Sequence, residues 1–389
     1  MSVDAHLTWT RVTVLLLLAA CGCGDDGATS VDASIDTAPA IDADPRTTIV
    51  PGAAFSIGPD DIARQDEDPA ITVDARGSLY ALWYSNRGMA AGGPADKQVY
   101  AIKSTDGVAW SAPVAISSGA DWAFAPSVAV TATGLVATWW NWHNNATGGG
   151  TTNWIVARTS ADGLTWSAPI EAVTSGLGDW LPAVVDDPTT SRVLVYFAAV
   201  ARRADGSIDT SESRSRLFVV VKTAAGWGPV TPLAAVNDAV THQSYPFVLR
   251  RADGTFAMTW TRFSGTDGSW SAVLTQPASE TWVATSPDGL TWSSARKISG
   301  PAVNVFPSLH HDHAGAALSV TWVTTDGAAS GQVVELPFQG TYPADRVVRA
   351  NLAGYTPRVH ATATPGVYWG VWVQGTDPNQ RVRGQFFAK

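Results

Sequence analysis

The sequence predicts an all-β fold, a six-bladed β-propeller, from a repeated pattern of prolines and aromatic residues. An apolar segment that begins with proline recurs six times at intervals of 50 to 64 residues, at Pro69, Pro126, Pro182, Pro246, Pro307 and Pro357. An aromatic residue follows each proline after 13 to 15 residues, at Trp83, Trp139, Tyr196, Trp260, Trp322 and Trp372. The 18 tryptophans and 35 glycines among 389 residues are typical of short strands joined by tight turns.

Each repeat is long enough for four strands. The proline segment and the aromatic segment are the first two, and the turn between them carries glycine or aspartate, which tolerate the backbone of tight hairpins. We expect third strands near residues 99–102, 154–156, 217–219 and 281–283, and fourth strands near 112–114, 168–170, 230–232 and 296–298. Four strands at this period form one propeller blade.

The last repeat is too short for four strands of its own. Residues 380–387 supply its third strand, and the chain then ends at Lys389. The apolar segment 53–57 belongs to no other repeat. We therefore predict that this N-terminal strand pairs with the last blade and closes the ring, which removes an exposed sheet edge.

The N-terminal region has the pattern of an export signal. Residues 12–20 form an apolar run of signal-peptide length, and Leu18-Ala19-Ala20-Cys21 resembles a bacterial lipobox. We expect 1–20 to be a lipoprotein signal peptide, Cys21 to be lipidated, 21–48 to be a disordered tether and 49–389 to be the propeller. Such a protein is exported and lipid-anchored to a bacterial membrane, and Gly22 favours the outer membrane. The alternative is an ordinary signal peptide with a chance cysteine.

Three turns between the third and fourth strands share the pattern Ser-x-Asp-Gly-x-x-Trp, at residues 104–110, 160–166 and 286–292. They resemble the Asp-box (BNR) repeat of sialidases, in a form one residue shorter than usual. The resemblance covers residues 53–389 and implies a sialidase-like propeller. It assigns a structural role to the aspartates and tryptophans of these turns, on the face away from the active site: Asp106, Trp110, Asp162, Trp166, Asp288 and Trp292.

In a propeller, the loops that enter the innermost strands converge on one mouth, so the residues before the repeat prolines are candidates for a binding site. Mixed aromatic and polar side chains suit sugars, because rings stack on C–H patches and polar groups bind hydroxyls. The substrate-binding candidates from the two loop sets are Asp66, Trp122, Trp180, Tyr355, Arg87, His143 and Arg262. For Trp122 and Trp180, packing between blades is an equal alternative.

The candidate catalytic residues are Glu67, Asp121, Asp179, His242 and Tyr245. Glu67 with Asp121 or Asp179 would act as acid and base in a glycosidase. His242 with Tyr245 or Arg262 would instead abstract a proton in a polysaccharide lyase. Sialidases carry an arginine two residues before the first repeat proline, where this chain has Glu67. The resemblance therefore does not extend to ordinary exo-sialidase activity.

Composition limits the partners. The net charge of −9 argues against nucleic acid, which needs a basic face. The run from His310 to His313 alternates across a strand and ends in a turn, so we expect no metal site and no cofactor. We predict a monomeric surface or periplasmic lipoprotein that binds glycans at the central funnel. The alternative is a glycan-degrading enzyme, an exo-glycosidase or polysaccharide lyase of non-sialidase specificity, and a protein-binding scaffold stays open.

Overall fold

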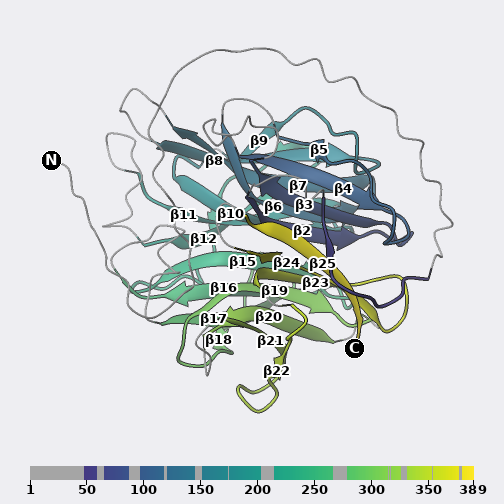
Figure 1. Ribbon diagram of the computed structural model, residues 1–389. Helices are drawn as coiled ribbons and strands as arrows, with labels where there is room; N and C mark the ends of the chain where they lie inside the picture. Colours follow the sequence, from purple (N-terminus) through teal and green to yellow (C-terminus); the bar gives the residue numbers. More distant parts are fainter. Residues whose placement is uncertain are drawn as a thin grey trace.

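The computed structural model describes residues 48–58, 65–86, 97–117, 121–144, 151–173, 175–202, 214–265, 278–313, 315, 317–325, 331–352, 354–375 and 379–389. Within these ranges the regular secondary structure is entirely β, in strands β1 to β25. The described part of the chain has no helix long and apolar enough to cross a membrane. The strands form six antiparallel sheets, which are the six predicted blades (Figure 1).

The first three blades follow one another along the chain, each from its innermost to its outermost strand. Blade 1 consists of β2 (Asp66–Val73), β3 (Leu79–Ser85), β4 (Gln98–Ser104) and β5 (Val114–Ala115). Blade 2 consists of β6 (Trp122–Thr131), β7 (Gly134–Asn144), β8 (Thr151–Ser160) and β9 (Ile170–Val173). Blade 3 consists of β10 (Gly178–Asp187), β11 (Arg192–Val200), β12 (Arg216–Thr223), β13 (Gly226–Trp227) and β14 (Thr231–Pro232).

The other three blades complete the ring. Blade 4 consists of β15 (His242–Arg250), β16 (Phe256–Phe263), β17 (Ser279–Ser286) and β18 (Arg296–Lys297). Blade 5 consists of β19 (Asn304–His311), β20 (Leu318–Thr324), β21 (Gln332–Pro337) and β22 (Val347–Val348). Blade 6 consists of β23 (Tyr355–Ala361), β24 (Val367–Gln374), β25 (Arg381–Ala388) and β1 (Phe55–Ser56). The innermost strands contact one another in the order β2, β6, β10, β15, β19 and β23, and β23 returns to β2.

The N-terminal strand closes the ring as predicted. Phe55 pairs with Gly384, and the Ile57 amide donates to the Val382 carbonyl at 3.0 Å. Gly384 is needed here, because a Cβ atom at this position would lie 2.8 Å from the Phe55 ring. In Figure 1 the purple start of the described chain lies beside the yellow strand β25. Both ends of the propeller are therefore held in one sheet.

The repeat prolines mark a bulge in every innermost strand. The register with the second strand shifts at each proline, and the residue before it has a positive φ of 44° to 57°. These six residues, here called the bulge ring, are Asp68, Ala125, Leu181, Tyr245, Phe306 and Thr356. Proline fits a bulge because it donates no ladder hydrogen bond. Left-handed backbone in non-glycine residues is strained, and such strain clusters at binding and catalytic sites.

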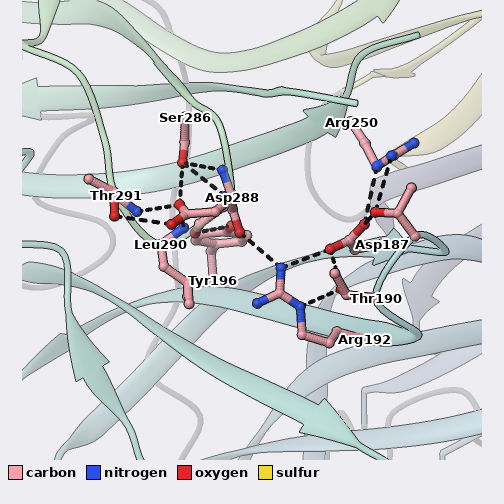
Figure 2. Close-up of polar contacts among 11 residues, drawn as sticks. Asp187, Thr190, Arg192, Tyr196, Arg250, Ser286, Asp288, Leu290 and Thr291 are labelled. Carbon is pink, nitrogen blue, oxygen red and sulfur yellow. Dashed lines mark hydrogen bonds and ion pairs between the residues drawn. The ribbon is translucent and has the colours of Figure 1, made fainter. Parts of the chain in front are cut away.

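The three Ser-x-Asp-Gly turns are held by their own aspartates, and the turn of blade 4 also contacts blade 3 through the hydrogen bond from Arg192 to the Asp288 carbonyl (Figure 2). In blade 4, Asp288 Oδ1 accepts from the Leu290 amide at 2.8 Å and the Thr291 amide at 2.6 Å. Burial alone would raise the pKa of Asp288, but these hydrogen bonds lower it below its ordinary value. Asp106 and Asp162 make the same bonds in blades 1 and 2. All three carboxylates are thus engaged in turn structure.

Candidate functional site

Four residues of the bulge ring line a small cavity of about 30 Å³ on the propeller axis. The residues before the repeat prolines therefore converge, as the repeat predicted. Besides four of those prolines, the cavity is lined by Asp68, Ala125, Leu181, Tyr245 and Arg358. Asp68 and Arg358 bring opposite charges to this point from the first and last blades. The axial mouth thus contains a carboxyl group, a guanidinium and a phenol among apolar side chains.

Asp68 is enclosed by protein and keeps only a part of its surface open to the axial cavity. Burial, and then the nearby Glu67 carboxylate, raise the pKa of Asp68 to about 7, although Arg358 and Lys97 act in the opposite direction. Burial likewise lowers the pKa of Arg358 to about 10. A carboxyl group that titrates near neutral pH is suited to give and take a proton.

Glu67 lies next to Asp68 in a compact polar group. Its Oε2 accepts a hydrogen bond from the Tyr84 hydroxyl at 2.6 Å, and its Oε1 is 3.6 Å from Lys97 Nζ. Lys97 also lies over the Tyr84 ring, 5.0 Å from its centroid. Burial, followed by Glu67, holds the pKa of Tyr84 well above its ordinary value. Tyr84 is therefore a neutral donor that fixes the Glu67 carboxylate in place.

Asp66, expected to bind substrate, instead lies inside blade 1 with 0% of its surface exposed. Its Oδ1 accepts a hydrogen bond from the Trp83 indole at 3.2 Å. The equivalent side chains in blades 4 and 5 do the same: Gln243 accepts from Trp260 at 2.7 Å, and Asn304 accepts from Trp322 at 3.0 Å. The position three residues before the proline is thus an acceptor for the aromatic residue of the second strand. Asp66, predicted from the sequence to bind substrate, thus lies inside the blade and accepts from Trp83.

Asp179 occupies the same position in blade 3, where the second-strand aromatic residue is Tyr196 instead of tryptophan. No described indole donates to Asp179, and its Oδ1 accepts from the Ser175 hydroxyl at 2.5 Å. Burial raises the pKa of Asp179 to about 7, partly offset by the Ser175 hydrogen bond and the charge of Arg202. Asp179 is 1% exposed, so it is a buried titrating group beside the mouth.

The aromatic candidates differ in exposure. Trp122 is partly exposed and meets Trp142 edge-on, with ring centroids 5.1 Å apart. Tyr355 is also partly exposed, accepts a hydrogen bond from Gln380 and lies 6.3 Å from the Phe306 ring. Trp180 is 1% exposed and belongs to the main hydrophobic core, in agreement with its packing alternative. Trp122 and Tyr355 therefore retain surface for a ligand, whereas Trp180 does not.

The lyase candidates in blade 4 are engaged with neighbouring groups. His242 is 0% exposed, and its Nδ1 accepts from the Ser215 amide at 3.2 Å while its Nε2 donates to the Gly265 carbonyl at 3.1 Å. Arg262 pairs with Asp238 at 2.8 Å and lies over the Trp282 ring. Both nitrogens of His242 are thus occupied, which disfavours it as a base that abstracts a substrate proton.

Several predicted residues are only partly covered by the structure. Arg87 and Cys21 lie outside the described residues, and so does the side chain of His143. Asp121 is partly exposed, and its carbonyl accepts from the Gln98 side chain at 3.4 Å. Within the described ranges, no three His, Cys, Asp or Glu side chains are grouped so that they could hold a metal ion.

Asp68 directly precedes a repeat proline and so belongs to the residues that the sequence places at the mouth, although no role was assigned to it, whereas sequence analysis did not select Lys97 or Arg358. Arg358 had a detectable signal, because it directly follows a repeat proline. The five equivalent positions carry small or apolar residues, namely Ala70, Ser127, Ala183, Phe247 and Ser308. A single charge in a repeated position of the innermost strand indicates a group that faces the axis. Lys97 had no such signal, since it lies outside the repeat pattern.

No family model matches this chain, and no curated protein matches its sequence. Solved structures do match in fold. A protein of unknown function from Dyadobacter fermentans is 12% identical, with a TM-score of 0.64, over 87% of this chain and 98% of that one. The α-L-arabinanase of Penicillium chrysogenum, complexed with arabinobiose, is 13% identical, with a TM-score of 0.58, over 88% and 98%.

A third match is the GH93 α-L-arabinofuranosidase of Fusarium graminearum, also complexed with arabinobiose. It is 15% identical, with a TM-score of 0.57, and the match covers 87% of this chain and 98% of that chain. At these identities the similarity establishes the fold alone. The chain is thus a six-bladed β-propeller whose structural neighbours include an arabinanase and a GH93 arabinofuranosidase.

Proposed function

We propose that this protein is a glycoside hydrolase that cleaves a neutral glycan at the axial mouth. The observation that carries the proposal is Asp68, an enclosed carboxyl group that lines the axial cavity together with Tyr245 and Arg358. With a pKa of about 7, Asp68 is protonated in a large fraction of molecules at neutral pH and is suited to protonate a leaving-group oxygen. Glu67 and Asp121 are the candidates for the second carboxyl group.

Two observations support a neutral substrate. The Glu67 carboxylate beside the mouth would repel the carboxylate of an acidic sugar. Two propellers of similar fold hold arabinobiose, which is a neutral sugar. Fold similarity does not assign a substrate. Arabinan oligosaccharides are therefore the first members of a substrate panel, followed by other neutral oligosaccharides and by acidic ones.

The test is sugar release from this panel by the purified protein, its Asp68→Asn and Glu67→Gln variants, and an Asp106→Asn control. Asp106 lies in the turn that follows the third strand of blade 1, outside the loops that form the mouth. Its carboxylate accepts hydrogen bonds from the Val108 and Ala109 amides. Loss of a general acid or base typically costs about 10²–10⁴-fold in rate. We expect such a loss in Asp68→Asn and near-normal rates in Asp106→Asn. Release of sugar by Asp68→Asn at the wild-type rate would exclude Asp68 as the acid.

A second candidate function is glycan binding without cleavage. It is favoured by the partly exposed Trp122, which lies with Trp142 and Phe124 in one aromatic cluster at the start of blade 2. Exposed ring faces bind sugars without any need for acid–base chemistry. Binding of a panel oligosaccharide that is never cleaved, weakened by Trp122→Ala, would favour this function over hydrolysis.

We also propose that the chain is a sialidase-like propeller exported as a lipoprotein and anchored through Cys21. The three Ser-x-Asp-Gly turns support the sialidase-like assignment, and the lipobox-like residues 18–21 support the anchor. Metabolic labelling with an alkyne fatty acid in a bacterial host tests the anchor. We expect the wild-type chain to be labelled and the Cys21→Ala variant to remain unlabelled. An equally labelled variant would exclude Cys21 as the attachment site.

A further inference from the structure

A second cavity, of about 330 Å³, lies on the propeller axis beyond the bulge ring. All six innermost strands line it through the residues that follow the repeat prolines, in the segments 70–73, 127–130, 183–186, 247–250, 309–311 and 358–361. We call it the axial chamber. Pro188 lines its far end and is exposed, so the chamber reaches solvent at the face opposite to the mouth. A small molecule can therefore enter it without crossing the bulge ring.

Arg358 carries the positive charge at the inner end of the chamber. It lines both the chamber and the mouth cavity, and it is partly exposed to the space that they enclose. Its Nη1 donates to the Pro357 carbonyl at 3.0 Å, and its guanidinium lies 5.4 Å from the centroid of the Phe247 ring. Among the described residues, no carboxylate forms an ion pair with Arg358. The remaining N–H groups of this guanidinium are therefore available to a ligand.

The charge of Arg358 is only partly balanced by the protein. Burial lowers the pKa of Arg358 to about 10, so the guanidinium is still charged at neutral pH. The carboxyl group that interacts with it is Asp68, whose own pKa of about 7 leaves it ionised in only part of the molecules. An enclosed charge without a close counter-ion loses much of its hydration. This imbalance favours an anion on the chamber side of Arg358.

The other charged groups of the chamber lie at its far end. Asp186 is three residues beyond Ala183, which is the equivalent of Arg358 in blade 3, and is thus about 10 Å further along the axis. Burial raises the pKa of Asp186, and the neighbouring positive charge of Arg250 opposes this effect. The Arg250 Nε atom is itself 3.4 Å from Asp187 Oδ1. The charges at this end are therefore compensated, unlike the charge at the inner end.

The wall between the two ends is mostly apolar. Its partly exposed side chains are those of Ile71, Val128, Ala129, Phe247 and Leu249. His360 lies on the same face of β23 as Arg358, because the two residues are separated by one position in a strand. Burial lowers the pKa of His360 to about 4, so its ring is neutral at neutral pH. An apolar body can thus contact this wall while an anionic group reaches Arg358.

These features select the chemical class of a ligand. The planar fork of a guanidinium matches the two oxygens of a carboxylate. A second anionic group on the same ligand would face Asp186. The chamber is at the small end of ligand sites, which span roughly 300–1,000 Å³. A small monocarboxylate with an apolar chain therefore fits the charge, the wall and the size of the chamber.

We propose that the axial chamber is a second ligand site, separate from the mouth, that binds a small aliphatic monocarboxylate with its carboxylate on Arg358. The site requires no glycan, so it stands whether the mouth cleaves glycans or only binds them.

The first experiment is calorimetric titration of the full-length protein at pH 7 with acetate, butyrate and hexanoate. We expect the affinity to rise with chain length, by up to about fourfold for each buried methylene group. Butyramide has the shape of butyrate without its charge, and adipate adds a second carboxylate to the length of hexanoate. We expect both to bind at least tenfold more weakly than their monocarboxylate counterparts.

The second experiment repeats the hexanoate titration on variants. We expect at least tenfold weaker binding in Arg358→Met and a smaller loss in Arg358→Lys, which keeps the charge but not the fork. Arg251→Met is the matched control, since Arg251 pairs with Asp253 at 3.5 Å and lines neither cavity. It should bind as the wild type does. Asp68→Asn should bind hexanoate at least as tightly, because it removes a competing carboxylate at the mouth.

A measurement on the wild type alone guards against misfolded variants. The imidazole C–H signals in proton spectra report on the surroundings of each histidine. We expect hexanoate to shift the signals of His360, which lines the chamber, and to leave those of His242, which does not. The proposal is overturned if none of the three monocarboxylates binds at millimolar concentration. It is also overturned if Arg358→Met binds hexanoate as tightly as the wild type, or if hexanoate binds without shifting His360.

Discussion

The Tyr196 hydroxyl donates a 2.6 Å hydrogen bond to the Gly289 carbonyl, across the junction between blades 3 and 4 (Figure 2). In three other blades the residue at this position of the second strand is a tryptophan that donates to a polar side chain three residues before the repeat proline. Because Tyr196 instead donates across the junction, Asp179 is left with Ser175. The tyrosine that replaces tryptophan at this repeat position therefore bridges blades 3 and 4. It also leaves the buried Asp179 carboxyl group without an indole donor, and burial raises the pKa of that group to about 7.

Tyr196→Phe is expected to destabilise the propeller by about 1–3 kcal/mol, since it leaves the buried Gly289 carbonyl without its donor. The free energy of unfolding in urea measures this loss. Val108→Ala, at a residue that is 85% exposed, is the control and should stay within about 0.5 kcal/mol of the wild type. A Tyr196→Phe variant as stable as this control would show that the hydroxyl is dispensable.

A comparison of Gly289→Ala with Gly366→Ala separates the cost of steric contact from the cost of backbone strain. Their φ values are +74° and +76°, but a Cβ atom on Gly289 would lie 2.8 Å from Leu194 and from the Tyr196 hydroxyl, whereas one on Gly366 has nothing within 4 Å. Gly366→Ala should cost about 1–2 kcal/mol through strain alone. Gly289→Ala should cost clearly more, measured by the same urea unfolding. Equal losses of unfolding free energy would mean that Leu194 and Tyr196 of blade 3 move to accommodate the added methyl group.

Trp83→Phe is expected to cost about 1–2 kcal/mol more than Trp372→Phe. Both indoles are buried at the same position of a second strand, in blades 1 and 6. The Trp83 indole donates to Asp66, whereas the Trp372 indole has no acceptor in the described structure. The difference in unfolding free energy therefore isolates the hydrogen bond to a buried carboxylate. If Trp372→Phe costs as much, ring packing and not this bond determines both losses.

Stability should fall as the pH rises from about 4 to about 7. In this window Asp68 and Asp179 keep their protons in the folded protein, where each has a pKa of about 7, but have lost them in the unfolded chain. The unfolded state then binds fewer protons, so each unit of pH lowers the free energy of unfolding until the folded groups also ionise. Urea unfolding at a series of pH values should therefore give a shallower decline for Asp68→Asn than for the wild type.

Asp106→Asn is the matched control for this pH series. Hydrogen bonds from its turn lower the pKa of Asp106, despite the opposing effect of burial. Its contribution to stability is therefore present above about pH 4 and is lost only as the pH falls below that value. Between pH 5 and pH 8 its curve should run parallel to the wild type. A curve for Asp68→Asn that also ran parallel would contradict the raised pKa of Asp68.

The number of blades, the order of strands and the closure by residues 53–57 were all predictable from the sequence. These features depend on local periodicity and on turn residues, which repeat every sixty residues or so. The pattern also located the mouth, because the six prolines mark equivalent points in equivalent strands. The strained bulge at each proline was not predicted, since a positive φ is a property of the paired strand and not of proline itself.

The assignment of individual site residues required the tertiary structure. Asp66 and Asp179 occupy the same repeat position and are the same residue type, yet one holds an indole and the other titrates near neutral pH, according to the aromatic residue that faces it. Asp68 and Arg358 are far apart in the chain and meet only because the last blade closes against the first. Local sequence determines which strands form. Burial and the charges brought together by ring closure determine which carboxyl groups keep their protons.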